Sequence, residues 1–177
     1  MIDEPEPAIV TKRLVLSRIA RDDVDELVAM LLNPALYDFI GGAPASATAA
    51  GDRVARWLRG STDPDVLWVN YVARRRDDGG LVGLAQATVS RANGSGYGTC
   101  EVAYLVDPPA QRRGLGTEMM SGFCVELHET LHPAEFTANI HPGHTASEAV
   151  AKALGLIPTD ERVDGERVWR ATAPRTR

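Results

Sequence analysis

The stretch from residue 101 to residue 118 constrains the fold of this chain more than any other part of its sequence. An apolar strand pattern over residues 99–106 leads into Asp107-Pro108-Pro109, and the run Gln111-Arg112-Arg113-Gly114-Leu115-Gly116 then opens a helical pattern. Glycines let the backbone approach a ligand closely, and the free amides of a helix N-terminus favour negative charge. The two arginines add positive charge. The stretch therefore predicts a cradle for an anion such as a pyrophosphate.

The spacing of the glycines excludes two other phosphate-binding loops. A dinucleotide-binding loop needs Gly-x-Gly-x-x-Gly inside a parallel βαβ unit, and a P-loop needs Gly followed by Lys and then Ser or Thr. The pattern Gln/Arg-x-x-Gly-x-Gly after a strand ending in Val-Asp-Pro instead resembles the coenzyme A-binding motif of the GNAT superfamily of N-acetyltransferases. The alternative is a surface loop whose arginines are only solvated.

The resemblance covers nearly the whole chain and is greatest to the ribosomal-protein N-terminal acetyltransferase type, the RimJ- and RimL-like members. The matching segments are Thr11-Lys12-Arg13-Leu14-Val15-Leu16, Glu101-Val102-Ala103-Tyr104, Thr117-Glu118, Pro142-Gly143-His144-Thr145-Ala146-Ser147 and Leu154-Gly155-Leu156. Two positions depart from the type: His144 stands where Asn is usual, and Leu156 stands where Phe is usual. The first departure bears on the hydrogen bonds to the pantetheine arm of the coenzyme.

Hydrophobic periodicity and turn signals predict the elements. Strands are expected at 13–19, 67–75, 81–90, 99–106, 136–140, 157–163 and 167–171, and helices at 22–32, 46–58, 114–132 and 145–154. The resemblance implies the GNAT fold, in the α/β (α+β) class. Such a fold has a mixed, mostly antiparallel sheet of about six to seven strands, splayed at its central strands, with helices on both faces. One acetyltransferase domain over residues 1–177 is expected, with flexible tails at 1–10 and 172–177.

Composition narrows the partners and the compartment. The net charge of -5 argues against general binding to nucleic acid or to an anionic membrane, because phosphate surfaces reward basic proteins. Cys100 and Cys124 match no zinc or redox spacing and are expected to be free, buried thiols in a reducing cytoplasm. The acidic start does not fit a signal peptide, and no apolar run approaches the roughly 20 residues of a membrane span. A cytoplasmic protein is therefore expected, with Arg74-Arg75-Arg76 as a solvated strand end.

The resemblance implies acetyl-CoA as the acetyl donor, with no metal. A backbone N–H at about Leu105 or Val106 is expected to stabilise the oxyanion that forms when an amine attacks the thioester. The coenzyme-binding candidates lie in the central strand, the glycine loop and the segment before the last helix: Leu105, Val106, Gln111, Arg112, Arg113, Gly114, Leu115, Gly116, Thr117 and His144.

Three residues are catalytic candidates. Glu101 is the first choice for the general base, with partial burial expected to raise its pKa; the alternative is a strand-face Glu paired to an arginine on the neighbouring strand. Ser147 matches a serine that protonates the leaving thiolate in some relatives, or else caps a helix. Tyr104 orients substrate or acts as an acid, or else packs in the core. Ala151 stands where many other members carry a tyrosine acid.

The acceptor implied by the resemblance is a primary amine, either a protein N-terminus or a small molecule. The superfamily builds its acceptor site from the loop between the first two helices, which here carries Tyr37, Asp38 and Phe39. These residues are candidate substrate contacts, and ordinary packing of the loop is the alternative. A homodimer is left open by analogy, because members of the superfamily often dimerise.

Two other functions stay open. A catalytically idle coenzyme A-binding sensor or partner protein would use the same glycine loop. The run His128-Glu129-Thr130-Leu131-His132 spells the H-E-x-x-H of zinc hydrolases. Against that interpretation, Pro133 disfavours helical geometry at His132, and no recognisable third ligand follows.

Overall fold

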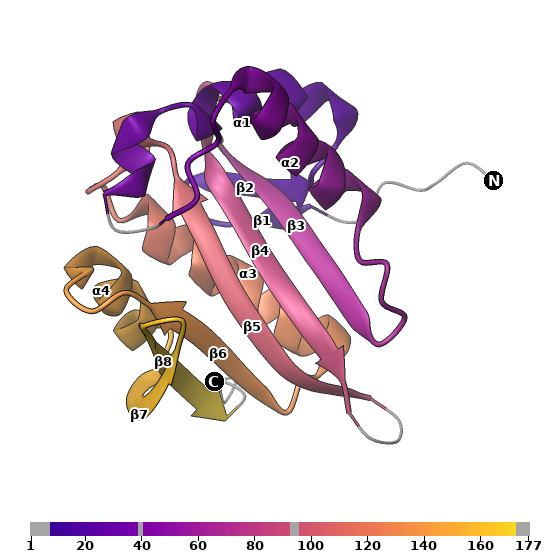
Figure 1. Ribbon diagram of the computed structural model, residues 1–177, viewed down its shortest axis with the longest axis vertical. Coiled ribbons are helices and arrows are strands. Elements are labelled where there is room, and N and C mark those ends of the chain that lie inside the picture. The colour runs from indigo at the N-terminus through magenta and orange to yellow at the C-terminus, as the bar shows by residue number, and fades with distance from the viewer. Residues whose placement is uncertain (1–7, 39–40, 93–95, 173–177) are drawn as a thin grey trace.

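One eight-stranded sheet runs through the computed structural model, which describes residues 8–38, 41–92 and 96–172 (Figure 1). The strands lie in the order β1-β2-β3-β4-β5-β6-β8-β7, and every neighbouring pair is antiparallel except the parallel pair β5 and β6. This confirms the expected mixed, mostly antiparallel sheet. The strands are β1 (Ile9–Val10), β2 (Leu14–Arg18), β3 (Val66–Arg75), β4 (Leu81–Arg91), β5 (Tyr97–Val106), β6 (Glu135–Ile140), β7 (Ile157–Val163) and β8 (Glu166–Thr172). The helices are α1 (Val24–Leu31), α2 (Ala47–Arg59), α3 (Leu115–Leu131) and α4 (Thr145–Ala153), with short 3-10 turns η1 (Arg21–Asp23), η2 (Pro34–Tyr37) and η3 (Pro108–Ala110).

Helices α1 and α2 cover one face of the sheet (Figure 1). Leu84 of β4 and Leu105 of β5 pack there with Leu27 of α1 and Val54 of α2. The C-terminal turn of α2 ends at Gly60, which has a positive φ of 78° that suits a glycine. This face is where the loop between α1 and α2 also lies.

Helix α3 covers the opposite face, so the expectation of helices on both faces is confirmed (Figure 1). Its buried residues Met119 and Phe123 pack against Tyr71 of β3 and Val102 of β5. Strand side chains alternate between faces, so β5 contributes Val102 to this core and Leu105 to the other. In the described ranges, no helix is both long enough and apolar enough to cross a membrane.

Helix α4 packs over the C-terminal strands rather than over the centre of the sheet. Its residue Ala151 is buried with Ile140 of β6, Leu156 and Trp169 of β8. Ala151, which the resemblance aligns with a tyrosine acid, is therefore part of a small apolar core.

The first strand corrects the expected N-terminal tail. Ile9 and Val10 pair with Leu16 and Val15 of β2 and raise the strand count to eight. The strand can approach α3 closely because residue 122 is glycine: a Cβ there would lie 2.8 Å from Thr11 Cγ2. At the other end, β8 includes residue 172, which was expected in the C-terminal tail, and the rest of that expected tail lies outside the described residues.

The arginine run at the end of β3 is held by partners within the protein. Arg74 and Asp23 form an ion pair of 2.8 Å, and Arg75 and Asp78 form another of 2.8 Å. Arg76 donates to main-chain carbonyls of the segment before β2. These contacts confirm that the run lies at a strand end, but they correct the expectation of solvated arginines, because each guanidinium has a partner within the protein.

Candidate active site

The parallel strands β5 and β6 part in the middle of the sheet. Their pairing covers only three residues of β5 and ends where Glu101 lies opposite Thr137. Beyond Glu101, β5 continues beside β4 as far as Val106, whereas β6 continues beside β8. The expected splay of the central strands is therefore present, and it begins at Glu101.

The part of β5 beyond Glu101 directs main-chain groups toward the side that β6 has left. Asp107 donates its N–H to Val82 of β4 at 2.8 Å. Because N–H groups alternate between the two edges of a strand, those of Val106 and Tyr104 are directed away from β4. Leu105 has its N–H on the β4 side and its side chain in the core under α1 and α2. Of the two residues expected to provide the oxyanion donor, the geometry favours Val106.

A tight loop links β5 to α3 and begins at the turn η3. The side chain of Gln111 donates to the carbonyl of Val106 at 3.0 Å, which holds the loop against the end of β5. Arg112 and Gly114 both have positive φ values, of 58° and 72°. Gly114 is the N-cap of α3, and glycine adopts this left-handed conformation without the steric cost of a Cβ.

The start of α3 presents free backbone amides where the sequence predicts an anion site. The first backbone N–H groups of a helix have no partner within it, and here they belong to Leu115, Gly116 and Thr117. The first bond within the helix is from the N–H of Glu118 to Gly114, at 3.2 Å. Arg112 and Arg113 are exposed beside these amides. The donor set therefore fits the pyrophosphate of a coenzyme, with hydrogen bonds from main chain and charge from side chains.

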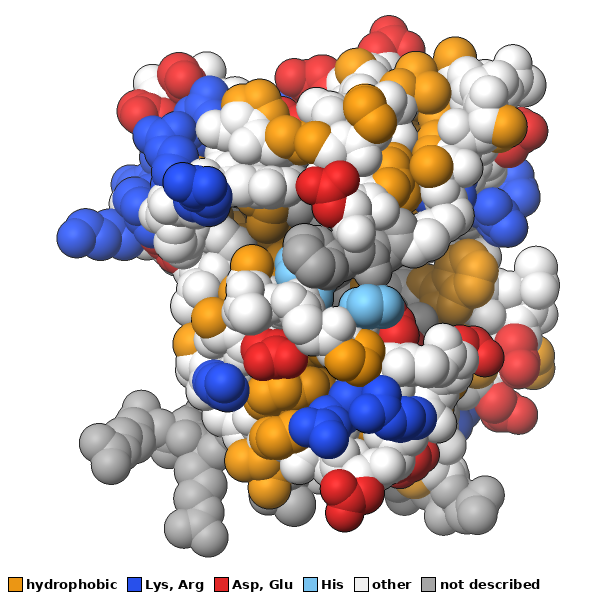
Figure 2. All heavy atoms as spheres, turned by 60° about the vertical axis from the view of Figure 1, so that its left-hand side comes forward, with side chains coloured by type: hydrophobic (Ala, Val, Ile, Leu, Met, Phe, Trp, Pro, Cys, Tyr) orange, Lys and Arg blue, Asp and Glu red, His pale blue; other side chains and the backbone are white. Residues whose placement is uncertain are grey.

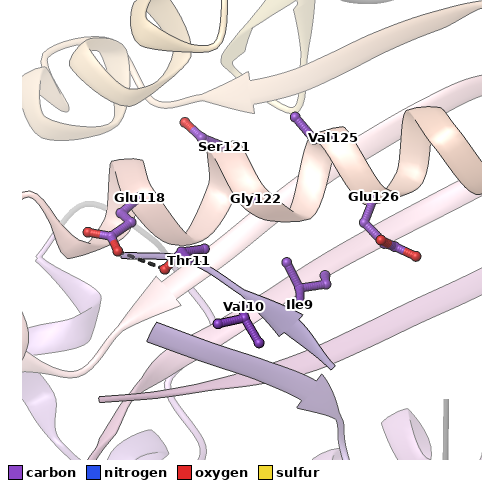
Figure 3. Close-up of a pocket in the computed structure, with 8 residues that line it drawn as sticks. All are labelled: Ile9, Val10, Thr11, Glu118, Ser121, Gly122, Val125 and Glu126. Atoms are coloured by element: carbon purple, nitrogen blue, oxygen red, sulfur yellow. Dashed lines mark hydrogen bonds between the residues drawn. The ribbon is translucent and has the colours of Figure 1, made fainter. Parts of the chain in front are cut away.

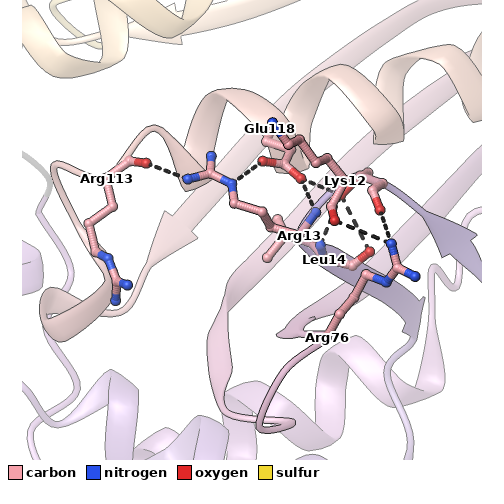
Figure 4. Close-up of polar contacts among 7 residues, drawn as sticks. Lys12, Arg13, Leu14, Arg76, Arg113 and Glu118 are labelled. Atoms are coloured by element: carbon pink, nitrogen blue, oxygen red, sulfur yellow. Dashed lines mark hydrogen bonds and ion pairs between the residues drawn. The ribbon is translucent and has the colours of Figure 1, made fainter.

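A network from the other end of the chain fixes this loop (Figure 4). Arg13 pairs with Glu118 at 2.6 Å and also donates to the carbonyl of Arg113 at 3.0 Å. Thr11 donates to Glu118 at 2.7 Å. Burial by itself raises the pKa of Glu118, but the hydrogen bonds from Thr11 and Arg13 outweigh it and hold the pKa below its usual value. The sequence does not predict that these two segments meet, although the opposite charges of Arg13 and Glu118 are a signal for it.

Tyr104 and Ser147 meet across the splay. The Tyr104 hydroxyl donates to Ser147 Oγ at 3.1 Å, and the ring packs against the α3 core. Burial raises the pKa of Tyr104, so its hydroxyl stays protonated well above neutral pH. Ser147 is not the helix cap, because the N-cap of α4 is His144. His144 is half-buried, and burial lowers its pKa.

Glu101 faces the other side of β5, next to a cavity of about 220 Å³. The cavity lies under α2 and is lined by Trp57, Trp68, Asn70, Gln86, Ala87, Thr88, Glu101 and Ala103. Glu101 is exposed rather than partly buried as expected, since the cavity is open to solvent. The alternative of an arginine partner has no support, because none of the ion pairs found among the described residues includes Glu101.

A second carboxylate lies near Glu101, at the start of β8. Burial raises the pKa of Glu166, the positive charge of His141 opposes that shift, and the negative charge of Glu101 adds to it. Figure 2 shows the side of the molecule at which β5 and β6 end in Figure 1. Histidine side chains lie near the middle of this view, with carboxylates close by. The surroundings of Glu101 thus include a second carboxylate, and His141 lies close to that carboxylate.

The loop between α1 and α2 begins with a residue that packs against the helices. The Tyr37 hydroxyl donates to the carbonyl of Leu31 at 2.8 Å, and its ring packs against the core under α1 and α2. The structure thus gives Tyr37 the packing role that was the alternative. Asp38 is exposed at the end of η2, and Phe39 lies outside the described residues.

The histidine motif at the end of α3 lacks the geometry of a zinc site. Residue His132 leaves the helix with a φ of 48°, and its Nδ1 lies against the carbonyl of His128. Among the described residues, no group of three His, Cys, Asp or Glu side chains is placed to hold a metal ion. Cys100 and Cys124 are buried and free, as expected, and burial raises the pKa of each thiol to about 12.

Another cavity, of about 380 Å³, lies between β1 and α3 (Figure 3). It is mostly apolar, and Val10 and Val125 on its rim are 61% and 47% exposed. Glu118 is its only link to the coenzyme loop, and that carboxylate is already occupied by Thr11 and Arg13. This cavity is therefore separate from the one beside Glu101, and the two share no lining residue.

Comparison with known proteins defines the class that this fold and site represent. The family model of the acetyltransferase (GNAT) domain matches residues 13–157. The chain therefore belongs to the GNAT acetyltransferases, an acyl-CoA-dependent family of N-acetyltransferases. No curated protein sequence matches the chain significantly.

Solved structures share the fold at low sequence identity. A GNAT-family acetyltransferase from Bacillus anthracis has a TM-score of 0.73 and 13% identity, covering 94% of this chain and 99% of its own. An acetyltransferase from Agrobacterium tumefaciens has a TM-score of 0.68 and 20% identity, covering 93% and 94%. RimL, a ribosomal L7/L12 alpha-N-protein acetyltransferase solved in complex with coenzyme A, has a TM-score of 0.73 and 13% identity, covering 94% and 98%.

Proposed function

We propose that the chain, acting as one acetyltransferase domain, moves an acetyl group from acetyl-CoA to a primary amine by direct attack in a ternary complex. The observation that carries the proposal is the position of Glu101, at the point where β5 and β6 part and on the face next to an open cavity. Acetyl-CoA supplies the acetyl thioester. The amine belongs either to a protein N-terminus or to a small molecule.

The glycine loop binds the donor. The free backbone N–H groups at the start of α3 donate hydrogen bonds to the pyrophosphate; they belong to Leu115, Gly116 and Thr117. Arg112 and Arg113 neutralise its charge. The edge of β5 that β6 leaves free beyond Glu101 then receives the pantetheine arm. His144, at the start of α4, lies on the opposite side of the arm.

Glu101 takes the proton of the attacking amine. An alkylammonium ion has a pKa of about 10.4 and no lone pair, so it must lose a proton before it can attack. The amine nitrogen forms a bond to the acetyl carbon, the carbon–sulfur bond breaks, and the proton removed from nitrogen goes to the carboxylate or to water bound to it. The N–H of Val106 stabilises the negative charge that develops on the thioester oxygen.

Ser147 returns a proton to the leaving thiolate. Its hydroxyl already accepts a hydrogen bond from Tyr104, so Ser147 can give its own proton to sulfur and receive another from Tyr104, which then regains a proton from water. The raised pKa of Tyr104 keeps that replacement proton in place at neutral pH.

Replacing Glu101 by Gln tests the proposal. We expect kcat for amine acetylation to fall roughly 100-fold or more, as is typical of removing a general base, with the affinity for acetyl-CoA unchanged. Glu129→Gln is the matched control, because Glu129 is an exposed carboxylate in the histidine motif and outside the proposed site. Steady-state kinetics and calorimetric titration with acetyl-CoA measure the two effects.

Three other outcomes would contradict the proposal. Binding of acetyl-CoA without turnover of any amine would indicate a coenzyme A-binding sensor. Loss of activity in Glu129→Gln but not in Glu101→Gln, together with inhibition by a chelator, would indicate zinc chemistry. Equal activity of wild type and Glu101→Gln across the pH range would remove Glu101 as the base.

A further inference from the structure

The cavity beside Glu101 is built from two rows of side chains that cross three strands. Trp68, Thr88 and Glu101 form one row, as the registers of β3 with β4 and of β4 with β5 show. Asn70, Gln86 and Ala103 form the next row. Trp57 closes the cavity from α2. The third row, with Leu84 at its centre, belongs to the apolar core, so the cavity begins where the core ends.

The lining of the cavity has one ionisable side chain and two indoles. Glu101 supplies the charge, while Trp57 and Trp68 supply flat apolar surface that also attracts cations. Both tryptophans are half-buried, which leaves part of each ring accessible. This chemistry suits a single positive charge attached to an apolar body.

A pair of amide side chains keeps the cavity open. Gln86 donates to Asn70 at 2.8 Å, and Asn70 donates to the main-chain carbonyl of Trp57 at 3.3 Å. Asn70 is only 6% exposed, so its hydrogen bonds are shielded from water. The pair fixes the last turns of α2 to the sheet and sets the distance between Trp57 and the strands.

We infer that the acceptor is a small arylalkylamine: a primary amine with one positive charge and one aromatic body. The amine lies at Glu101, and the aromatic body lies against Trp57 and Trp68. The inference rests on the proposed function and names the substrate class of that same site.

The size and charge of the cavity argue against the other amines. A volume of about 220 Å³ is below the roughly 300–1,000 Å³ of drug-sized pockets, which favours a compact molecule over an aminoglycoside. A polyamine would place its further charges among indole and amide side chains, because Glu101 is the one ionisable group in the lining and the nearby Glu166 lies outside it. The experiment below also includes a peptide, so it distinguishes a small amine from a protein N-terminus as the acceptor.

The test compares four acceptors in the presence of acetyl-CoA: 2-phenylethylamine, tryptamine, spermidine and a hexapeptide with a free N-terminal serine. We expect kcat/KM to be at least tenfold higher for the two arylalkylamines. Trp68→Ala is the main variant, because Trp68 is half-buried on a strand and is not part of the packed cores. It should raise KM for 2-phenylethylamine roughly tenfold with little change in kcat, as expected for a lost cation–π and apolar contact.

Three further variants test whether the effect on KM comes from the cavity. Trp68→Phe keeps an aromatic face and should restore most of the affinity. Ala103→Leu fills the cavity from β5 and should raise KM even if the loss of Trp68 were compensated elsewhere. Ile157→Ala is the control, since Ile157 is an exposed apolar residue on β7, away from the cavity.

A binding measurement separates this inference from the proposed function. Titration of wild type with 2-phenylethylamine, followed by indole fluorescence excited at wavelengths that the amine does not absorb, should show a saturable change that Trp68→Ala reduces. If no amine is acetylated, this titration still decides the inference. Preference for spermidine or the peptide, an unchanged KM in Trp68→Ala, or no saturable fluorescence change in wild type would overturn it.

Discussion

Two residues of β5 divide the proposed chemistry between opposite faces of one strand. Glu101 points toward the cavity under α2, and Tyr104, three positions later, points toward α3. The proton taken from the amine and the proton given to sulfur therefore pass through different side chains. Ser147 joins the second of these paths from α4.

Removal of the hydroxyl of Tyr104 or of Ser147 should slow the reaction, because both belong to one proton path to the leaving sulfur. We expect Tyr104→Phe and Ser147→Ala each to lower kcat about tenfold, toward the low end of general acid effects because water can replace a lost hydroxyl. Because the two hydroxyls act in series, the double variant should be no slower than the slower single variant. Since burial raises the pKa of Tyr104, wild-type kcat should show no loss from tyrosine ionisation below about pH 10. Additive losses would contradict a shared path.

Glu118 should make stability depend on acidic pH. The hydrogen bonds from Thr11 and Arg13 overcome burial and lower the pKa of its carboxyl in the folded state. A group of this kind stabilises the protein above its unfolded pKa of about 4.3, and that contribution is lost as pH falls through the lower folded value. We expect Glu118→Gln to be less stable than wild type at pH 7, with the difference shrinking below about pH 4.3. Urea unfolding at several pH values measures it; a difference that is constant with pH would argue against the assignment.

At the scale of elements, the junction between β5 and α3 is where backbone geometry produces a binding site. Gly114 adopts a left-handed conformation so that the loop can turn directly into the helix. Gln111 and Arg13 then hold the loop from opposite sides. The free amides of α3 thus lie at the end of β5, next to the gap that β6 leaves.

Substitution of Gly114 should weaken coenzyme binding more than folding. Alanine at a φ of 72° carries a steric cost of about 1 kcal/mol, and we expect Gly114→Ala to raise the Kd for coenzyme A roughly fivefold. Gly155→Ala is the matched control, because Gly155 has a φ of 80° just after α4 and nothing lies within 4 Å of an added Cβ. Calorimetry should find its Kd unchanged despite a similar loss of stability. If both variants raised the Kd equally, the effect would come from a general loss of stability and not from the geometry of the coenzyme loop.

At the scale of the whole molecule, what the sequence reveals is mainly local. The hairpin turns, the helix start at Gly114 and seven of the strands follow from periodicity and turn residues that are close in sequence. The strand β1 could not be predicted in this way. Its two residues depend on β2 and on the close approach that Gly122 allows.

The candidate site divides in the same way. The loop from Gln111 to Gly116 is one continuous motif, so its role could be read directly. The cavity under α2 could not, because Trp57 and Trp68 come from different elements and carry no motif. Likewise the exposure of Glu101 depends on how α2 packs over the sheet, which the local sequence does not specify.

Binding of acetyl-CoA should stabilise the entire fold. A ligand at 100 times its Kd that binds only the folded state adds about 2.7 kcal/mol, which for a chain of this length corresponds to a rise in Tm of roughly 5–10 °C. We expect a saturable rise with acetyl-CoA in a thermal-shift titration and none with zinc. Destabilisation by a chelator without any response to acetyl-CoA would instead direct attention to His128 and His132.

The contact between Arg13 and Glu118 spans 105 positions of the chain and therefore has a consequence for biosynthesis. A ribosome adds about 5–20 residues per second, so Arg13 waits roughly 5–20 s before its partner has been made. Closing so long a loop also costs entropy that only later contacts can repay. The segment that steadies the coenzyme loop is thus translated well before the loop itself, and a nascent chain stalled before residue 118 has no finished place for the coenzyme.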